Sequence, residues 1–277
     1  MPARARVLWM YGHRVAVWGV VALLVFPIYW MFNTSLAPQN QIYVYPPQLI
    51  HPGASFAAYA KVFQERPMAR WFLNSLVVVV LSGVYSLTAG ALAGYGLSRF
   101  RSRGTGTLGY LLLASRMLPT TLLVIPLFVA MSAVHLINTL WSVVIANVTF
   151  IMPFATWMLK GYFDGIPREL DEAAYIDGSS RLGALARVVL PLAAPGLAAT
   201  ALYSAILAWD EYLFARTFLT STSTWTIAVG LGSFRGEYVT YWNEVMAASL
   251  IGTLPLIVIF LVLERQLVHG LTAGAVK

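Results

Sequence analysis

Acidic residues gather in one short stretch of a chain that otherwise carries few charges. The chain has 277 residues, of which only 10% are charged, yet five of its 11 acidic residues fall between positions 164 and 177. Small residues, Ala173 and Ala174, follow directly after Glu172. A carboxylate beside two small side chains could anchor a partner protein while letting its backbone approach closely. Three apolar neighbours could fill a groove on that partner: Leu170, Tyr175 and Ile176. The alternative is an ordinary amphipathic connector.

The local signals around this cluster predict two short helices joined by a turn. Pro167 suits the first turn of a helix, and the acidic residues after it complement the helix dipole. Asp177-Gly178 is a turn signal, because glycine adopts positive φ without strain. Ser179 or Ser180 can cap the second helix, and Leu190-Pro191 is expected to end it. We call residues 166–191 the elbow.

A second group of polar residues lies within apolar segments, where such side chains are costly and often line a transport pathway. We expect Trp157 and Trp209 to offer stacking faces for a ring of the ligand. The alternative for this group is hydrogen bonding between helices or, for the two acids, anchoring at the membrane interface. The pathway candidates are Arg116, Asn147, Trp209, Asp210 and Glu211.

Several catalytic chemistries are excluded or disfavoured. The chain has no cysteine, its four histidines are scattered, and no nucleophile–base constellation appears. We therefore expect neither a metal site nor an enzyme. The chain lacks the G-x-x-x-x-G-K-[ST] loop that cradles ATP phosphates. Residues 104–109 match G-x-G-x-x-G, but no strand precedes them, so they are expected to begin a helix instead.

The elements that hold these residues are predicted to be membrane-spanning helices. The chain is 59% hydrophobic, whereas a soluble chain is about 25% charged. A span needs about 20 mostly apolar residues. Gly90 and Gly94 put small residues on one face of the second span, which favours close helix packing. The six expected spans are Val15–Phe32, Phe72–Leu97, Leu108–Val134, Leu140–Leu159, Ala194–Phe214 and Val245–Leu263.

Basic residues predict how these spans are oriented. With the N-terminus inside, 12 Lys and Arg residues fall in the inside segments and five in the outside loops. Cytoplasmic loops of membrane proteins carry such an excess, so both termini are expected in the cytoplasm. The same rule explains the net charge of +7 without nucleic acid as a partner. The elbow then faces the cytoplasm.

An ordered series of motifs resembles the permeases of ABC importers, and in particular their carbohydrate (maltose-type) subfamily. Glu172-Ala173-Ala174, Gly178 and Leu190-Pro191 resemble the EAA signature. Trp209-Asp210-Glu211-Tyr212 resembles W-N-E-[YF], with Asp210 replacing the usual Asn. The resemblance runs from about residue 26 to the C-terminus. Further matching segments are Asn74-Ser75, Met117-Leu118-Pro119, Pro126-Leu127-Phe128, Asn138-Thr139, Leu159–Phe163, Ile166–Leu170 and Gly270–Lys277.

The resemblance implies an all-α integral membrane fold of the type I ABC importer class. It implies a first helix within 1–33, an outer loop at 34–71, a core at 72–265 with the coupling loop at 161–191, and a cytoplasmic tail at 266–277. The residues implied to couple the chain to an ATPase are Glu172, Ala173, Ala174, Asp177, Gly178, Leu190 and Pro191.

The function implied is ATP-driven import of a sugar, oligosaccharide or polyol across a bacterial or archaeal cytoplasmic membrane. The implied partners are a second permease, two cytoplasmic ATPases that bind ATP and Mg, an extracytoplasmic solute-binding protein and membrane lipid. This chain itself is expected to hold no cofactor. The alternative is a secondary transporter driven by an ion gradient, a class that often shows inverted repeats and broken helices.

Overall fold

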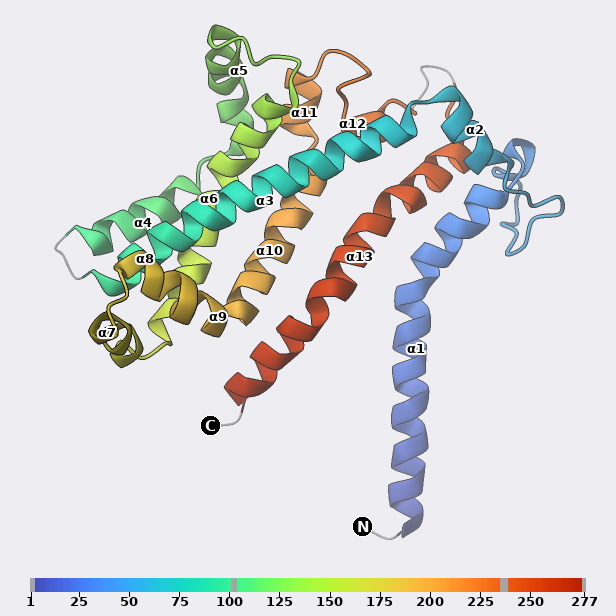
Figure 1. Ribbon diagram of the computed structural model, residues 1–277. Coiled ribbons are helices and arrows are strands. Elements are labelled where there is room, and N and C mark those ends of the chain that lie inside the picture. The colour runs from blue at the N-terminus through green and yellow to red at the C-terminus, as the bar shows by residue number, and fades with distance from the viewer. Residues whose placement is uncertain (1–2, 101–103, 235–238, 276–277) are drawn as a thin grey trace. The chain divides into compact units, whose positions relative to one another are not determined.

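The computed structural model describes residues 3–100, 104–234 and 239–275, and the side chains of 12–100, 104–234 and 239–264. Every regular element in these ranges is a helix, and no strand occurs among them (Figure 1). Residues 104–109, the glycine-rich match, begin helix α4 (Thr105–Ser115), with Gly104 at its N-cap. The prediction that this stretch starts a helix is therefore confirmed.

Four helices are long and apolar enough to cross a membrane. Each contains one of the predicted spans, namely the first, second, fourth and sixth. They run past the predicted ends because the polar turns at those ends are still helical. These helices are α1 (Ala3–Leu36), α3 (Met68–Arg99), α6 (Leu140–Asp164) and α13 (Trp242–Ala275).

Two further candidate spans are bent helix pairs, so the described residues contain four candidate spans, or up to six if each bent pair is one span. In the first pair, α4 is followed by the 3-10 helix η2 (Thr120–Leu123) and by α5 (Val124–Ala133), with a bend of 92°. The break falls at residues 116–119, where Pro119 has no backbone N–H to continue the helical ladder. The predicted span Leu108–Val134 is thus not one straight helix.

The second bent pair changes a predicted boundary. Residues 181–192 and α10 (Ala194–Trp209) meet at 83°. The predicted end of this span at Phe214 is wrong, because α10 stops at Trp209 and a separate helix, α11 (Leu213–Phe218), follows. Glu211 causes the new start, since its carboxylate accepts hydrogen bonds from the backbone N–H groups of Phe214 and Ala215 at 2.6 and 2.8 Å.

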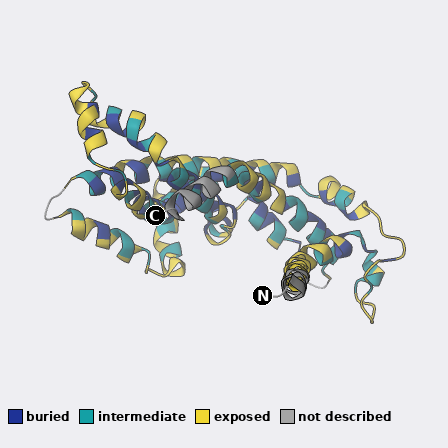
Figure 2. Ribbon diagram, turned by 90° about the horizontal axis from the view of Figure 1, so that it is seen from below, coloured by how far each residue is buried: buried dark blue, intermediate teal, exposed yellow. Residues whose placement is uncertain are grey.

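The chain divides into two compact units, residues 1–66 with 231–252, and residues 67–230 with 253–277. The first unit holds α1, η1 (Gln39–Gln41), α2 (Ala57–Glu65) and the start of α13. Residues 12–29 of α1 are all exposed although most are apolar, and Figure 2 draws this helix in yellow. An apolar helix that is exposed on every face over such a length is typical of a span that contacts lipid.

The core of the second unit is the pairing of α3 with α6. A Cβ atom on Gly90 would lie 3.0 Å from Ala155 Cβ, and one on Gly94 would lie 2.9 Å from the Thr156 carbonyl oxygen. The predicted packing role of these two glycines is confirmed. Helix α10 contacts α6 through a side chain instead, because a Cβ on Gly196 would lie 2.3 Å from the Tyr162 ring. Helix α12 (Ile227–Gly232) contributes residues 227–230 to the second unit and residues 231–232 to the first.

Candidate functional site

The elbow folds as two short helices joined by a turn, as predicted. Helix α7 (Glu169–Ile176) is followed by Asp177 and then Gly178, whose φ of +84° favours glycine. Helix α8 (Arg181–Ala184) begins at Ser180, whose Oγ accepts a hydrogen bond from the Gly183 backbone N–H at 3.1 Å. Ser180 is therefore the N-cap of α8.

The second helix of the elbow ends at Leu192, one residue after the predicted end at Leu190-Pro191. The helical path continues through the π-helix η3 (Leu185–Val189) and α9 (Leu190–Leu192), and it bends after Leu192. Leu190 donates to the carbonyl of Leu185, five residues back. Pro191 has no N–H to donate to the helical ladder. The wider π-helical turn before it lets the helix continue past this residue.

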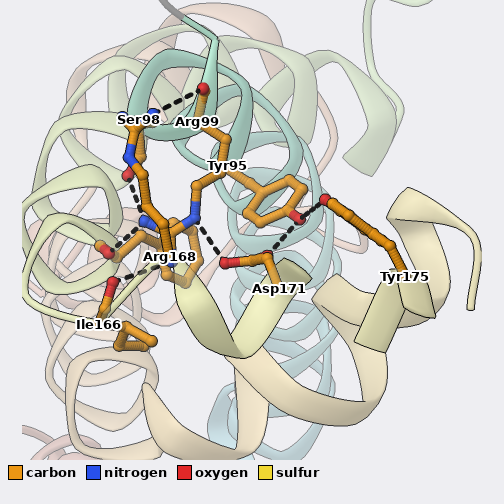
Figure 3. Close-up of polar contacts among 8 residues, drawn as sticks. Tyr95, Ser98, Arg99, Ile166, Arg168, Asp171 and Tyr175 are labelled. Atoms are coloured by element: carbon orange, nitrogen blue, oxygen red, sulfur yellow. Dashed lines mark hydrogen bonds and ion pairs between the residues drawn. The ribbon is translucent and has the colours of Figure 1, made fainter. Parts of the chain in front are cut away.

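The inner face of α7 is tied to the end of α3 by a buried carboxylate (Figure 3). Asp171 Oδ2 accepts from Arg99 Nε at 2.9 Å, and Asp171 Oδ1 accepts from the Tyr95 hydroxyl at 2.6 Å. The Arg99 and Asp171 side chains are only 8% and 4% exposed. The Tyr175 hydroxyl, also on α7, lies 3.1 Å from that of Tyr95. The four residues form one connected polar network.

Two arginines fasten the ends of α3 and α6 to each other. Arg99 also donates to the carbonyl oxygens of Phe163 and Ile166, at 2.9 and 3.2 Å. Arg168 donates to the carbonyl oxygens of Ser98 and Arg99, at 2.6 and 3.3 Å (Figure 3). The last carbonyls of a helix have no partner within the helix, and a cation near them also complements the helix dipole. Arg99, the last residue of α3, thus stabilises the end of α6, and Arg168, which follows α6, stabilises the end of α3.

Removing one member of this network would be costly. Breaking a buried ion pair leaves an uncompensated charge and destabilises a protein by about 3–5 kcal/mol. The Asp171 carboxylate is held by two donors that both lie on α3. Movement of α7 away from α3 would therefore break both bonds together, so this contact holds the elbow rigidly on the helix end.

The outer face of α7 presents a different set of residues. Glu172 and Ala173 are exposed, and the side chain of Ile176 is 87% exposed. Ala174 is 8% exposed and faces the protein itself. The expectation that both alanines make room for a partner is therefore wrong for Ala174, which lies three residues after Asp171 on the same helix face. Of the other predicted groove-filling residues, Leu170 and Tyr175 are each 39% exposed.

The remaining predicted coupling residues lie on the turn and the second helix. Asp177 and Gly178 are exposed at the tip of the elbow. Pro191 is exposed, and Leu190 is half-buried against the cluster formed by Tyr95, Leu159 and Phe163. The structure thus brings the seven predicted residues onto one elbow, with Ala174 pointing inward.

Three of the five pathway candidates line one pocket in the second unit. Arg116, Asn147 and Glu211 surround a space of about 260 Å³ beside Phe150 and Phe214, whose rings stack at 5.3 Å. Arg116 donates to the Phe150 carbonyl oxygen at 2.6 Å and to the Tyr203 hydroxyl at 2.9 Å. The side-chain nitrogen of Asn147, which is 4% exposed, has no hydrogen-bond partner within the described residues.

The other pathway candidates lie elsewhere. Trp209 is 5% exposed and packs edge-on against Phe72 at 5.8 Å, so neither face of its ring is open for stacking. Asp210 is exposed and does not line the pocket. Trp157 is 40% exposed, with Lys160 Nζ 5.8 Å from its ring centre. The prediction of tryptophan stacking faces is wrong for Trp209 in this conformation.

Four residues that attach the elbow to α3 and α6 were not predicted as site residues: Tyr95, Arg99, Arg168 and Asp171. Tyr95 and Arg99 lie 72 or more positions before Asp171, so no sequence spacing connects them. Asp171 could be distinguished from its acidic neighbours only by its place on the inward face of α7. Its i, i+3 relation to the small, apolar Ala174 was the available signal. The sequence had indicated Arg168 only as part of the motif Ile166–Leu170 and as one of the basic residues assigned to the inside.

Within the described chain, no group of three or more His, Cys, Asp or Glu residues could hold a metal ion.

Comparison with known proteins assigns the chain to a family. Residues 86–272 match the family of binding-protein-dependent transport system inner membrane components. The inner membrane ABC transporter permease protein YcjP of Escherichia coli (strain K12) is 37% identical, with 92% of each chain covered. The trehalose/maltose transport system permease protein MalG of Thermococcus litoralis is 33% identical, again with 92% of each chain covered. The chain belongs to this family.

A solved structure supports the same fold. The crystal structure of a bacterial ABC transporter involved in the import of the acidic polysaccharide alginate matches with a TM-score of 0.79 at 22% identity. The match covers 96% of this chain and 98% of that one. The chain therefore has the fold of ABC importer permeases, as the EAA-like motif implied. It is a multi-pass membrane permease, a transport subunit and not an enzyme.

Proposed function

We propose that this permease imports a carbohydrate and is driven by ATP that is hydrolysed in other subunits. Its relative from Thermococcus litoralis is named for trehalose and maltose transport. The motifs around residues 117–119, 126–128 and 209–212 resemble the same carbohydrate subfamily. Membership in a binding-protein-dependent family speaks against an ion-gradient-driven transporter.

In the proposed topology the chain crosses the cytoplasmic membrane of a bacterium or archaeon six times. Each bent helix pair then counts as one span, and both termini lie in the cytoplasm. The excess of Lys and Arg in the segments assigned to the inside supports this orientation. The elbow, at 166–191, then faces the cytoplasm.

The proposed assembly contains a second permease, two ATPase subunits and an extracytoplasmic solute-binding protein. The chain has no phosphate-binding loop, which is consistent with ATP and Mg bound by the ATPase subunits. The outward residues of the elbow would contact an ATPase: Glu172, Ala173, Ile176, Asp177 and Gly178.

The elbow would act as the joint that transmits ATPase movement to the spans. The observation that carries this proposal is its two-faced structure. Asp171 on the inner face is bonded to Arg99 and Tyr95, whereas Glu172 on the outer face is exposed. Coupling between sites requires contacts that differ between two states. A rigid inner attachment would let a change of contacts at the outer face move α3 and α6, and so alternate the access of the pathway.

Two substitutions on the outer face test this proposal. We expect Glu172→Ala and Gly178→Asp to abolish ATP-driven uptake in proteoliposomes while the chain still inserts and assembles. Gly178→Asp places a bulkier side chain at a φ of +84°, which costs about 1–2 kcal/mol in the left-handed region. Glu169→Ala is the matched control, because Glu169 is also exposed in the first turn of α7. Full uptake by well-expressed Gly178→Asp protein would refute the coupling role.

The pocket around Arg116 and Asn147 is the proposed part of the substrate pathway. Arg116 and Glu211 already have partners, whereas the Asn147 amide has a donor available to a passing hydroxyl group. Uptake measured for Asn147→Ala over a range of sugar concentrations tests this assignment. A raised KM is expected, and unchanged KM and maximal rate would remove Asn147 from the pathway.

A further inference from the structure

A second pocket lies in the first unit, and its lining residues have no role in the proposed coupling or substrate pathway. It has a volume of about 280 Å³ and is bounded by the end of α1, the loop after it and the first turns of α13. It shares no residue with the pocket around Arg116. The side chains that matter for its chemistry are Trp30, Gln41, Tyr43, Gln48, His51 and Trp242.

Three polar atoms at this pocket are buried without a partner. His51 is 7% exposed, and its Nδ1 has no hydrogen-bond partner in the described part of the chain. The same holds for the side-chain oxygens of Gln41 and Gln48. Buried polar groups in folded proteins almost always have a hydrogen-bond partner, and a buried group without one lowers the free energy of unfolding. Three such atoms at one pocket point to a ligand that supplies the missing hydrogen bonds.

The backbone that carries these side chains is held in place. Asn33 donates to the Gln48 backbone carbonyl at 3.0 Å, and the Tyr29 hydroxyl donates to the Leu49 carbonyl. Both donors lie on α1, next to the pocket residues Trp30 and Thr34. The unpartnered side chains therefore extend from a positioned loop, as in a binding site that is formed before its ligand arrives.

The lining selects the chemical class of the ligand. Among the described residues around the pocket, none is Asp, Glu, Lys or Arg, so a charged ligand would find no counter-ion. Amide oxygens accept hydrogen bonds, and an imidazole nitrogen can donate or accept. Trp30, Tyr43 and Trp242 add flat apolar surfaces. A small neutral ring with several hydroxyl groups on its edge and C–H groups on its faces satisfies both kinds of surface.

The size of the pocket limits the ligand further. Small-molecule sites usually enclose about 300–1,000 Å³, and this pocket lies just below that range. It has room for one sugar ring and not for an oligosaccharide chain. We propose that the pocket is a sugar-ring site, separate from the transport pathway, that binds neutral hydroxylated rings through Gln41, Gln48 and His51. In the proposed topology it lies on the extracytoplasmic side, where a binding protein would release its sugar.

The site can be tested on the assembled transporter in phosphatidylcholine nanodiscs, with no binding protein or nucleotide present. These lipids have no polyol headgroup that could occupy the pocket. The probes are methyl β-glucoside, methyl β-galactoside, maltose and trehalose, and glucuronate is the anionic probe. Binding is measured by saturation-transfer NMR. We expect saturable binding of at least one neutral probe and none of glucuronate.

Variants locate the binding. Gln48→Leu and His51→Leu should each weaken binding by about fivefold or more, the effect of losing one hydrogen bond. Gln64→Leu is the matched control, because Gln64 is exposed on α2 and does not line the pocket. A chromatographic profile like that of the unchanged transporter shows that each variant has folded.

The possible results separate this inference from the proposed function, on which it depends only for the side of the membrane. Loss of binding in Asn147→Ala, with binding unchanged in Gln48→Leu and His51→Leu, would place the sugar in the transport pathway and overturn the second site. Absence of saturable binding by all four neutral probes would also overturn it. Either result would leave ATP-driven sugar uptake, measured separately in proteoliposomes, intact.

Discussion

The elbow and the pocket around Arg116 and Asn147 both contain buried polar groups, but these groups differ in their hydrogen bonding. In the elbow, Asp171 has a hydrogen-bond partner at each of its carboxylate oxygens, and Arg99 reaches three acceptors on α6, α7 and the loop between them. In the pocket, Asn147 is equally buried, yet its side-chain nitrogen has no partner in the described residues.

This difference separates groups that hold the protein together from groups that face a ligand. A fully bonded network makes its region rigid, which suits the transmission of movement. An unbonded buried amide lowers stability, and it is retained where a ligand can bond with it. Substitutions in the two regions should therefore change stability in opposite directions, although both reduce transport.

The largest loss of stability is expected for Asp171→Ala. The substitution leaves Arg99 buried without its counter-ion and should lower the free energy of unfolding by about 3–5 kcal/mol. Thermal unfolding of the purified transporter measures this loss. The double variant Arg99→Met/Asp171→Leu should recover most of it, because apolar side chains of similar size can replace a buried ion pair. An unchanged unfolding temperature in Asp171→Ala would contradict the role given to the pair.

A smaller loss is expected at the contact of α3 with α6, which underlies both regions. Gly94→Ala would put a Cβ 2.9 Å from the Thr156 carbonyl oxygen, and such overpacking costs about 1–3 kcal/mol. Gly83→Ala on the same helix is the matched control, since nothing lies within 4 Å of its Cβ position. The control should be as stable as the unchanged protein or slightly more stable, because alanine favours helix over glycine. Equal unfolding temperatures for the two variants would argue against close packing at Gly94.

At Asn147 the change in the free energy of unfolding should have the opposite sign. Replacing this amide with Leu removes a buried donor that has no partner in the described chain, so the free energy of unfolding should rise by about 1 kcal/mol. Uptake should fall at the same time, because the donor offered to a substrate is gone. Thermal unfolding and uptake measured on one preparation check both parts. A variant that loses both stability and uptake would show that the amide is structural, and the contrast with the elbow would disappear.

The smallest effect is expected for an ion pair that is partly exposed. Lys61 Nζ lies 3.9 Å from Glu65 Oε2, and their side chains are 43% and 57% exposed, so Glu65→Gln should cost only about 0.2–1 kcal/mol. The hydrogen bond to Glu244 raises the pKa of Lys61 above its usual 10.5. A raised lysine pKa contributes stability below the unfolded value, and this contribution is lost as pH rises through the folded value. The difference between Glu65→Gln and the unchanged protein should therefore be constant from pH 6 to 9, because Lys61 stays protonated throughout that range. A difference that varies within that range would contradict the assignment.

Much of this architecture could be predicted from the sequence. The apolar runs indicated the spans, the small residues Gly90 and Gly94 indicated a close helix contact, and the turn signal at Asp177-Gly178 placed the elbow. These features depend on neighbouring residues, and local chemistry decides them. The bends could not be placed in the same way, since the end of α10 at Trp209 depends on the way Glu211 caps the next helix.

The network behind the elbow was beyond sequence reasoning for a different reason. Asp171 and Arg99 are 72 residues apart and meet only because α3, α6 and α7 end close together. The motif directed attention to Glu172, Ala173 and Ala174, which are adjacent in the chain but lie on different faces of α7. Helical periodicity distinguishes Ala174 from the other two, whereas the partner of Asp171 required the structure.

The most direct test of the account is the number of sugar molecules imported per ATP hydrolysed, measured in proteoliposomes with the complete transporter and its binding protein. Asp171→Asn is the informative variant, because the amide keeps the size of the side chain but removes the charge that pairs with Arg99. We expect ATP hydrolysis to continue while this ratio falls at least about fivefold, the effect of losing roughly 1 kcal/mol of coupling. We expect Glu169→Ala to keep the unchanged ratio. A folded Asp171→Asn transporter with the same ratio as the unchanged protein would contradict the claim that this contact transmits the movement.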